Sequence, residues 1–292
     1  MDETDPFEEQ RPRLFGLAYR LLGSAADAED VVQEAFLRWD AADRAAIVSP
    51  QAWLVTVVTR LGLSVLTSAR RRRETYVGPW LPEPVLTAGG ALGPLETVEQ
   101  RESVSWGVLV LLEELTPPER AVFVLHEAFG HPHGEIAELL GVDEATSRQH
   151  LHRARRHIAA GRRRFDVDQV QHRRVLERFL GAAFGGGTED LEDLLAADVV
   201  SWADGGGTRA ARRPVTGREK VARYLRGLTT LPDVAGVAAE VAEVNGEPAV
   251  LFRTGDGLAG VMVVEVGEGG IVALRTVVNP PKLSFAAAQQ PV

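Results

Sequence analysis

Residues 132–160 read PHGEIAELLGVDEATSRQHLHRARRHIAA. Apolar positions recur at helical spacing on both sides of Gly141, and a glycine can adopt the left-handed conformation that ends a helix. Asp143 can cap the helix that follows, because its carboxylate can accept hydrogen bonds from the first free N–H groups. The stretch therefore predicts a helix over 132–140, a tight turn, and a second helix over 143–160.

The second of these helices has two different faces. Leu151, Ala154 and Ile158 share the face that we expect to be buried. The opposite face carries Arg148, Gln149, His152, Arg153 and Arg156. Arginine can pair with guanine and glutamine with adenine through two hydrogen bonds, and such a helix fits the major groove. Because residues 148–164 hold 7 arginines and no acid, we interpret this helix as one that reads duplex DNA, with a solvated charged face as the alternative.

Composition alone points away from nucleic acid, because the 292 residues carry a net charge of −9. The charge is unevenly distributed, however: residues 1–50 hold 5 basic and 11 acidic side chains. The absence of cysteine excludes disulfides, thiolate metal sites and cysteine nucleophiles. No apolar run suggests a membrane helix and the first ten residues lack a signal-peptide pattern, so a cytoplasmic protein without a membrane partner is expected.

Residues 1–75 predict one helical bundle. The first helix covers 7–22 and Gly23 ends it, and Ser24 caps a second helix. The third helix starts at Pro50 and ends in Arg70, Arg71, Arg72 and Arg73. Periodicity favours Trp39 and Trp53 as core residues. The alternative is that they stack on unpaired bases while the arginines follow the backbone.

Residues 76–94 are rich in proline and glycine and are interpreted as a linker. Trp80, Leu81 and Pro82 are unusual there, because an aromatic ring and a leucine are costly to leave in water. They indicate either an exposed linker aromatic or a segment that docks in a groove. The following block, 95–166, is helical, and its Thr116-Pro117-Pro118-Glu119 is a capping box.

Residues 169–292 change character and predict a small α+β domain on an antiparallel sheet. Turn signals such as Asn245-Gly246 separate the strand-like runs. The expected helices cover 175–184, 189–196 and 215–228, and the expected strands cover 199–202, 237–244, 249–253, 260–266 and 271–278.

Two separate motifs resemble the extracytoplasmic-function sigma factors of RNA polymerase. One runs Asp27-Ala28-Glu29-Asp30-Val31-Val32-Gln33-Glu34-Ala35-Phe36-Leu37-Arg38 and is followed by Pro50-Gln51-Ala52-Trp53-Leu54. The other joins Gly134-Glu135-Ile136-Ala137-Glu138-Leu139-Leu140-Gly141-Val142 with Leu151-His152-Arg153-Ala154-Arg155-Arg156. The resemblance implies a multidomain protein: two all-α sigma domains, a helical bundle (1–75) and a helix-turn-helix domain (95–166), precede the α+β domain (169–292).

The resemblance also implies partners. Core RNA polymerase would be bound by the polar residues of the first motif, Asp27, Glu29, Asp30, Gln33 and Glu34. The −10 promoter element would be bound by residues 40–49 with Arg70, Arg71, Arg72 and Arg73, and the −35 element by the polar helix face quoted above. This sequence departs from the family pattern at Ser147, where a buried valine is usual, and at His150, where arginine is usual, which leaves the −35 preference open.

The C-terminal block resembles the SnoaL-like branch of the NTF2-like fold, which a subgroup of these sigma factors carries. The matching stretches are Trp80-Leu81-Pro82-Glu83-Pro84, Asp204-Gly205-Gly206-Gly207 and Asn279-Pro280-Pro281-Lys282-Leu283. The resemblance implies that this fused domain regulates the factor in place of a separate anti-sigma protein. We therefore expect an interdomain regulatory contact that involves these stretches.

Two other functions compete with this interpretation. One is a helix-turn-helix regulator with a ligand-sensing domain, and the other is an NTF2-like enzyme that uses Asp204 and His172. No catalytic residue, metal or cofactor is expected, because His126, His131 and His133 lack a helical i,i+4 pair and no phosphate-binding loop is present. A small-molecule ligand of the C-terminal domain stays open.

Overall fold

The computed structural model describes residues 5–93, 95, 97–161, 169–185, 187–207, 210–234, 236–267 and 269–289. The chain divides into two units, and the division does not follow sequence order. The first unit joins Met1–Thr75 with Thr87–Arg162, and the second joins Tyr76–Leu86 with Arg163–Val292. The expected linker is thus shared between the units.

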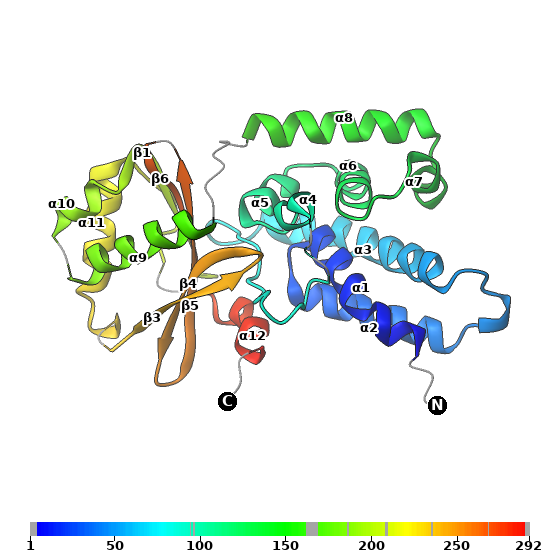
Figure 1. Cartoon of the computed structure of the whole chain (residues 1–292), viewed down its shortest axis with the longest axis horizontal. Coiled ribbons are helices and arrows are strands. Elements are labelled where there is room, and N and C mark those ends of the chain that lie inside the picture. The colour runs from blue at the N-terminus through cyan, green and yellow to red at the C-terminus, as the bar shows by residue number, and fades with distance from the viewer. Residues whose placement is uncertain are drawn as a thin grey trace. The chain divides into compact units, whose positions relative to one another are not determined.

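The first unit begins with a three-helix bundle (Figure 1). Its elements are α1 (Pro6–Leu22), α2 (Ala25–Asp40), the short 3₁₀ helix η1 (Arg44–Ala46) and α3 (Pro50–Glu74). Gly23 ends α1 with a left-handed φ of 66°, and Ser24 Oγ accepts a hydrogen bond from the Asp27 N–H at 3.1 Å. The helix starts and ends predicted from these caps are confirmed. Trp39 is buried, at 2% exposure, and Trp53 is half-buried 5.8 Å from it between ring centroids, which confirms the core interpretation for Trp39.

The second part of this unit carries the helix-turn-helix. Its elements are α4 (Val98–Glu102), α5 (Trp106–Glu113), α6 (Pro117–Phe123), the π-helical turn η2 (Val124–Ala128), α7 (His133–Leu140) and α8 (Glu144–Gly161). Gly141 ends α7 at a φ of 68°, and Asp143 Oδ1 accepts from the Thr146 N–H at 2.7 Å at the start of α8. Both caps are as the sequence predicts.

The two parts of the first unit are docked on each other. Helix α3 packs against α6 and α7, and α1 packs against η2. The contact includes two buried arginines: Arg20 Nε donates to Ser103 Oγ at 2.8 Å, and Arg120 Nε donates to the Arg20 carbonyl at 3.1 Å. Chain residues 87–93 also pack on α1, since Leu92 is buried and a Cβ on Gly16 would meet the Leu92 carbonyl oxygen at 2.3 Å. We call this arrangement the docked halves.

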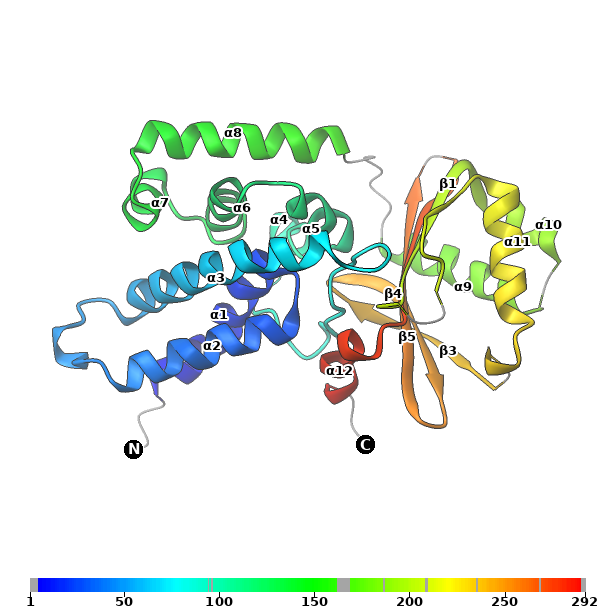
Figure 2. The same cartoon turned by 180° about the vertical axis from the view of Figure 1, so that it is seen from behind.

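The second unit is a six-stranded sheet with strand order β2-β1-β6-β5-β4-β3. Helices α9, α10 and α11 lie on one side of the sheet and α12 lies on the other, as the opposite view in Figure 2 also shows. The strands are β1 (Leu195–Asp204), β2 (Val215–Thr216), β3 (Ala238–Val244), β4 (Glu247–Thr254), β5 (Gly257–Gly267) and β6 (Gly270–Val277). The helices are α9 (Gln169–Gly185), α10 (Thr188–Glu192), α11 (Arg218–Thr229), η3 (Pro232–Val234) and α12 (Pro280–Ala288).

Three sequence-based expectations for this unit were wrong. Leu195 and Ala196 belong to β1 and not to a helix, because Leu195 pairs with Ile271 in β6. Val215 and Thr216 form β2, since Gly217, with a φ of 95°, separates them from α11. The pair β1·β6 is parallel, in an otherwise antiparallel sheet, because a long connection that contains the other strands returns the chain beside β1.

Candidate functional site

The surface of α8 shows the two faces that its sequence predicts. Ser147, Leu151, Ala154 and Ile158 are buried. The proposed DNA-reading side chains Arg148, Gln149, His152, Arg153 and Arg156 are all exposed. Arg148 Nη1 lies 2.6 Å from Glu144 Oε1, but both side chains are more than half exposed, so water weakens this pair.

Ser147 has a partner that the sequence analysis missed. Its hydroxyl lies 2.9 Å from His133 Nδ1, and the His133 ring stacks on His126 with centroids 4.7 Å apart. Burial lowers the pKa of His133, which favours the neutral form of its ring. His133 therefore satisfies the hydroxyl group of the buried Ser147.

Helix α2 presents one polar face. Ala28, Val31, Val32 and Ala35 are buried in the bundle. Glu29, Asp30 and Gln33 are exposed, and Asp27 and Glu34 are half-exposed. The sequence analysis missed Leu37, which is 54% exposed and lies one turn beyond Gln33 and Glu34. Leu37 therefore adds an apolar side chain to the exposed polar face of α2.

The expected −10 region is described in part. Residues 40–49 form η1 and the flanking turns, with the Arg44 guanidinium 5.1 Å from the Trp39 ring centroid and Val48 fully exposed. Because Trp39 is buried, it is not available for stacking on a base. Arg70, Arg71, Arg72 and Arg73 lie in the last turns of α3, and their side chains are outside the described part of the chain.

Within the second unit, residues Tyr76–Leu86 are held by the α+β domain, and we call them the linker segment. Asp204, at the end of β1, is fully buried and accepts three hydrogen bonds. They come from Tyr76 Oη at 2.5 Å, Leu81 N at 2.8 Å and Lys282 Nζ at 2.7 Å. The sequence left open whether Asp204 is a catalytic base or a contact residue. In the structure its carboxylate is used in contacts with the linker and with Lys282.

Lys282 completes this site from α12. Its ammonium group donates to the Leu81 carbonyl at 2.5 Å and lies 4.1 Å from the centroid of the Trp80 ring. Such a short approach to an aromatic face is a cation–π contact. Asn279 Nδ2 donates to Tyr76 Oη at 2.8 Å, and burial together with the Asp204 hydrogen bond raises the pKa of Tyr76. The three stretches named from the sequence resemblance are thus brought together.

The glycines after Asp204 make room for this arrangement. Gly206 has a φ of 58°, and a Cβ there would meet Asn279 side-chain atoms at 2.6–2.7 Å. Gly205 is buried, and Gly207 has a φ of 90°. On the linker side Leu81 and Pro82 are buried, as is Leu283 on α12. Trp80 is half-buried.

A second anchor of the linker segment was not anticipated. Asn245, buried in the turn between β3 and β4, exchanges two hydrogen bonds with Val85: Val85 N donates to Asn245 Oδ1 at 3.0 Å and Asn245 N donates to Val85 O at 2.9 Å. The Gln289 amide likewise exchanges two bonds with the Leu86 backbone, at 2.8 and 2.9 Å. Asn-Gly was interpreted from the sequence only as a turn, and its amide group also binds the linker.

His172, the other polar residue considered for catalysis, bonds through Nε2 to the Val264 carbonyl at 2.7 Å, and burial lowers its pKa. It is therefore engaged with the sheet backbone. Among the residues that the structure describes, no three histidine or acidic side chains gather into a group that could hold a metal. Within the same residues no helix is both long and apolar enough to span a bilayer.

Comparison with known proteins agrees with the three-helix bundle and with the helix-turn-helix part. The sigma-70 region 2 model matches residues 7–72 and the sigma-70 region 4 model matches residues 107–158. The chain is similar to the ECF RNA polymerase sigma factor SigJ of Mycobacterium tuberculosis, with 41% identity over 97% of this chain and 93% of that protein. It is also similar to the probable sigma factor SigI of the same species, with 34% identity over 99% of each chain.

The crystal structure of Mycobacterium tuberculosis SigJ superposes on this chain with a TM-score of 0.77, at 39% identity, covering 96% of this chain and 97% of that one. The chain belongs to the extracytoplasmic-function family of RNA polymerase sigma factors. It is a sigma factor that acts in transcription initiation. The three-helix bundle is sigma region 2, the helix-turn-helix part is sigma region 4, and an α+β domain follows, within the length over which the SigJ structure superposes.

Proposed function

We propose that this sigma factor binds core polymerase through the polar face of α2, reads promoter DNA through α8 and residues 40–49, and is regulated by its second unit in place of a separate anti-sigma protein. One observation carries the regulatory part. Asp204 is fully buried and two of its three hydrogen-bond donors, Tyr76 Oη and Leu81 N, come from the linker segment. A carboxylate buried in this way stabilises the bound linker only while these donors remain in place.

The polymerase contact rests on the exposed face of α2. Asp30, Gln33 and Leu37 lie within two turns of one another and none of them is buried in the bundle. Acidic side chains around an exposed leucine suit a basic partner surface with an apolar centre, since the charges direct the encounter and the leucine supplies buried area.

Reversal of charge at two of these positions is expected to weaken the complex with core polymerase. Asp30→Lys with Glu34→Lys should reduce affinity about tenfold or more, because like charges would then face each other across the interface. Both side chains are solvent-accessible, so the fold should persist. Co-purification with core enzyme measures the effect, and Glu8→Lys with Glu9→Lys on α1 makes the same change of charge as a control. If both variants co-purified equally well with core enzyme, the polar face of α2 would not be the polymerase-binding surface.

The promoter contact rests on α8. Five exposed polar side chains share one face, and the buried face holds the helix against the rest of the unit. This is the geometry in which a recognition helix presents side chains to base edges in the major groove. We assign Arg148 and Arg153 to the −35 element, with one of them reading a base.

Regulation follows from how the linker is held. Residues 76–86 are bound by the second unit, and residues 87–93 pack on α1 beside Gly16. The chain that joins the docked halves is therefore held at residues 76–86 by contacts in the second unit and at residues 87–93 by contacts in the first. Promoter elements at −35 and −10 lie about 25 base pairs apart, about 85 Å along B-DNA. The halves must separate to bind both elements at once, and polymerase shifts the population toward the separated form by binding it more tightly.

A further inference from the structure

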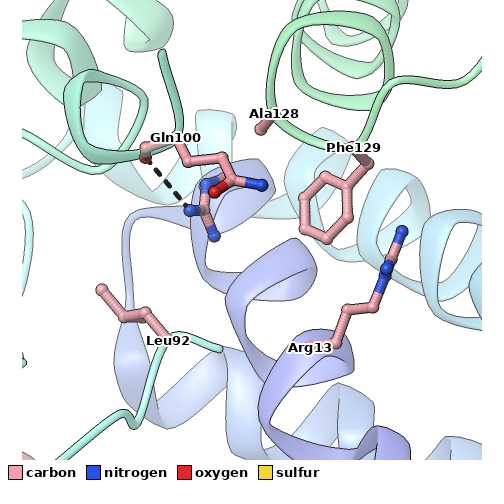
Figure 3. A pocket seen from close by; sticks show the side chains of 6 residues that line it. Arg13, Leu92, Gln100, Ala128 and Phe129 are labelled. Atoms are coloured by element: carbon pink, nitrogen blue, oxygen red, sulfur yellow. Dashed lines mark hydrogen bonds between the residues drawn. The ribbon is translucent and has the colours of Figure 1, made fainter. Parts of the chain in front are cut away.

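A small cavity of about 140 Å³ lies between the docked halves (Figure 3). It is lined by Arg13, Arg20, Leu92, Gln100, Ala128 and Phe129. Arg13 and Arg20 come from α1, and Gln100 and Ala128 come from α4 and η2 in the other half. The lining therefore contains two guanidinium groups and no acidic side chain, and its walls come together only when the halves are docked.

Arg13 lines this cavity and has an unused donor. Its Nε is buried and has no hydrogen-bond partner in the structure. A buried N–H without an acceptor is unfavourable, and such a group usually has a partner of some kind. The Arg13 side chain lies beside the Phe129 ring in Figure 3, with Cζ 5.4 Å from the ring centroid.

Arg20 adds a second cation that is only 2% exposed. Its three hydrogen bonds go to neutral oxygens: Ser103 Oγ at 2.8 Å, Gly16 O at 2.9 Å and Gln100 O at 3.3 Å. Burial lowers the pKa of Arg20 to about 9, so its charge is poorly compensated. Its Cζ also lies 5.4 Å from the Phe129 centroid. An anion in the cavity would compensate both guanidinium groups.

We propose that this cavity is a binding site for a small oxyanion, a free phosphate or a small carboxylate, held by Arg13 and Arg20. The volume accommodates about four to five water-sized groups, which suits such an ion. Because the walls come from both halves, the bound anion stabilises the docked form. That consequence rests on the proposed function, whereas binding itself does not.

The test is thermal unfolding of the full chain in inorganic phosphate and, separately, in malonate, each compared with chloride at equal ionic strength. At about ten times its Kd, the bound anion should raise Tm by about 3–5 °C. Arg13→Gln should abolish the rise, and Arg11→Gln, which changes a half-exposed arginine on the same helix, should keep it. The arm that shows the rise identifies phosphate or carboxylate as the ligand chemistry.

Equal responses of wild type and both variants, or no response of the wild type to either anion, would overturn the proposal. Arg13→Lys serves if Arg13→Gln fails to fold, because lysine keeps the charge and lacks the Nε–H; undiminished binding by Arg13→Lys would also overturn it. These measurements use free protein, so their failure leaves polymerase and promoter binding untouched.

Discussion

Substitution of Asp204 by alanine is expected to release the linker segment and to raise its rate of chymotrypsin cleavage about 100-fold. The change leaves the Lys282 ammonium buried, at 8% side-chain exposure, without its carboxylate. Removal of one member of a buried ion pair costs about 3–5 kcal/mol, and about 3 kcal/mol corresponds to about 100-fold in the population of the locally open form. Tyr76 and Trp80 provide chymotrypsin sites within the segment. Cleavage rates under native conditions measure this population.

A double substitution separates the ion pair from general damage. Asp204→Ala with Lys282→Met removes both charges and should release the linker less than Asp204→Ala alone, because no buried charge is left unpaired. Asp256→Ala, at an exposed turn between β4 and β5, should cleave like wild type. Promoter output should also change in Asp204→Ala. Wild-type cleavage and output in that variant would show that the second unit does not control the linker.

We expect one of Arg148 and Arg153 to read a base. Substitution of that arginine by alanine should reduce promoter-dependent transcription by about 5- to 150-fold, because a bidentate base contact contributes about 1–3 kcal/mol. The base-reading substitution should relax preference at one −35 position. The other substitution should lower the affinity for all DNA sequences alike. It should also reduce the salt dependence of binding by the contribution of about one phosphate contact. Binding to a library of −35 variants at several salt concentrations distinguishes the two roles.

Arg173→Ala on α9 is the matched control, since it removes one exposed arginine far along the chain from α8. It should leave both the −35 preference and the salt dependence unchanged. Full promoter-dependent transcription by a chain with alanine at both 148 and 153 would mean that α8 is not the recognition helix.

Local signals account for how well the helical unit could be predicted. Gly23, Ser24, Gly141 and Asp143 start or end helices through their own backbone or side-chain chemistry, so the sequence shows their effect directly. The apolar period of α8 likewise determines which side chains are exposed. Packing partners far along the chain have little effect on where these helices start and end.

Long-range pairing explains what the sequence did not show. The apolar residue Leu195 suits a helix or a strand, and its pairing with Ile271 decides between them. Asn245 looks like an ordinary turn residue until Val85 is placed beside it, 160 positions away. The sequence alone does not show a hydrogen-bond partner for the Ser147 hydroxyl. The fold supplies one, His133, which lies 14 positions away. Asp204 and the linker could be named from resemblance, but their bonds required the fold.

We infer that the free factor holds its two promoter-binding halves docked and must separate them to act. The chain contains no cysteine, so Glu9→Cys and Ala160→Cys, both exposed, provide the only two sites for a fluorescent donor and acceptor, one on each half. Energy transfer should be efficient and uniform in the free chain and should fall sharply in the complex with core polymerase and promoter DNA. Equal transfer efficiency in the free chain and in that complex would contradict the account.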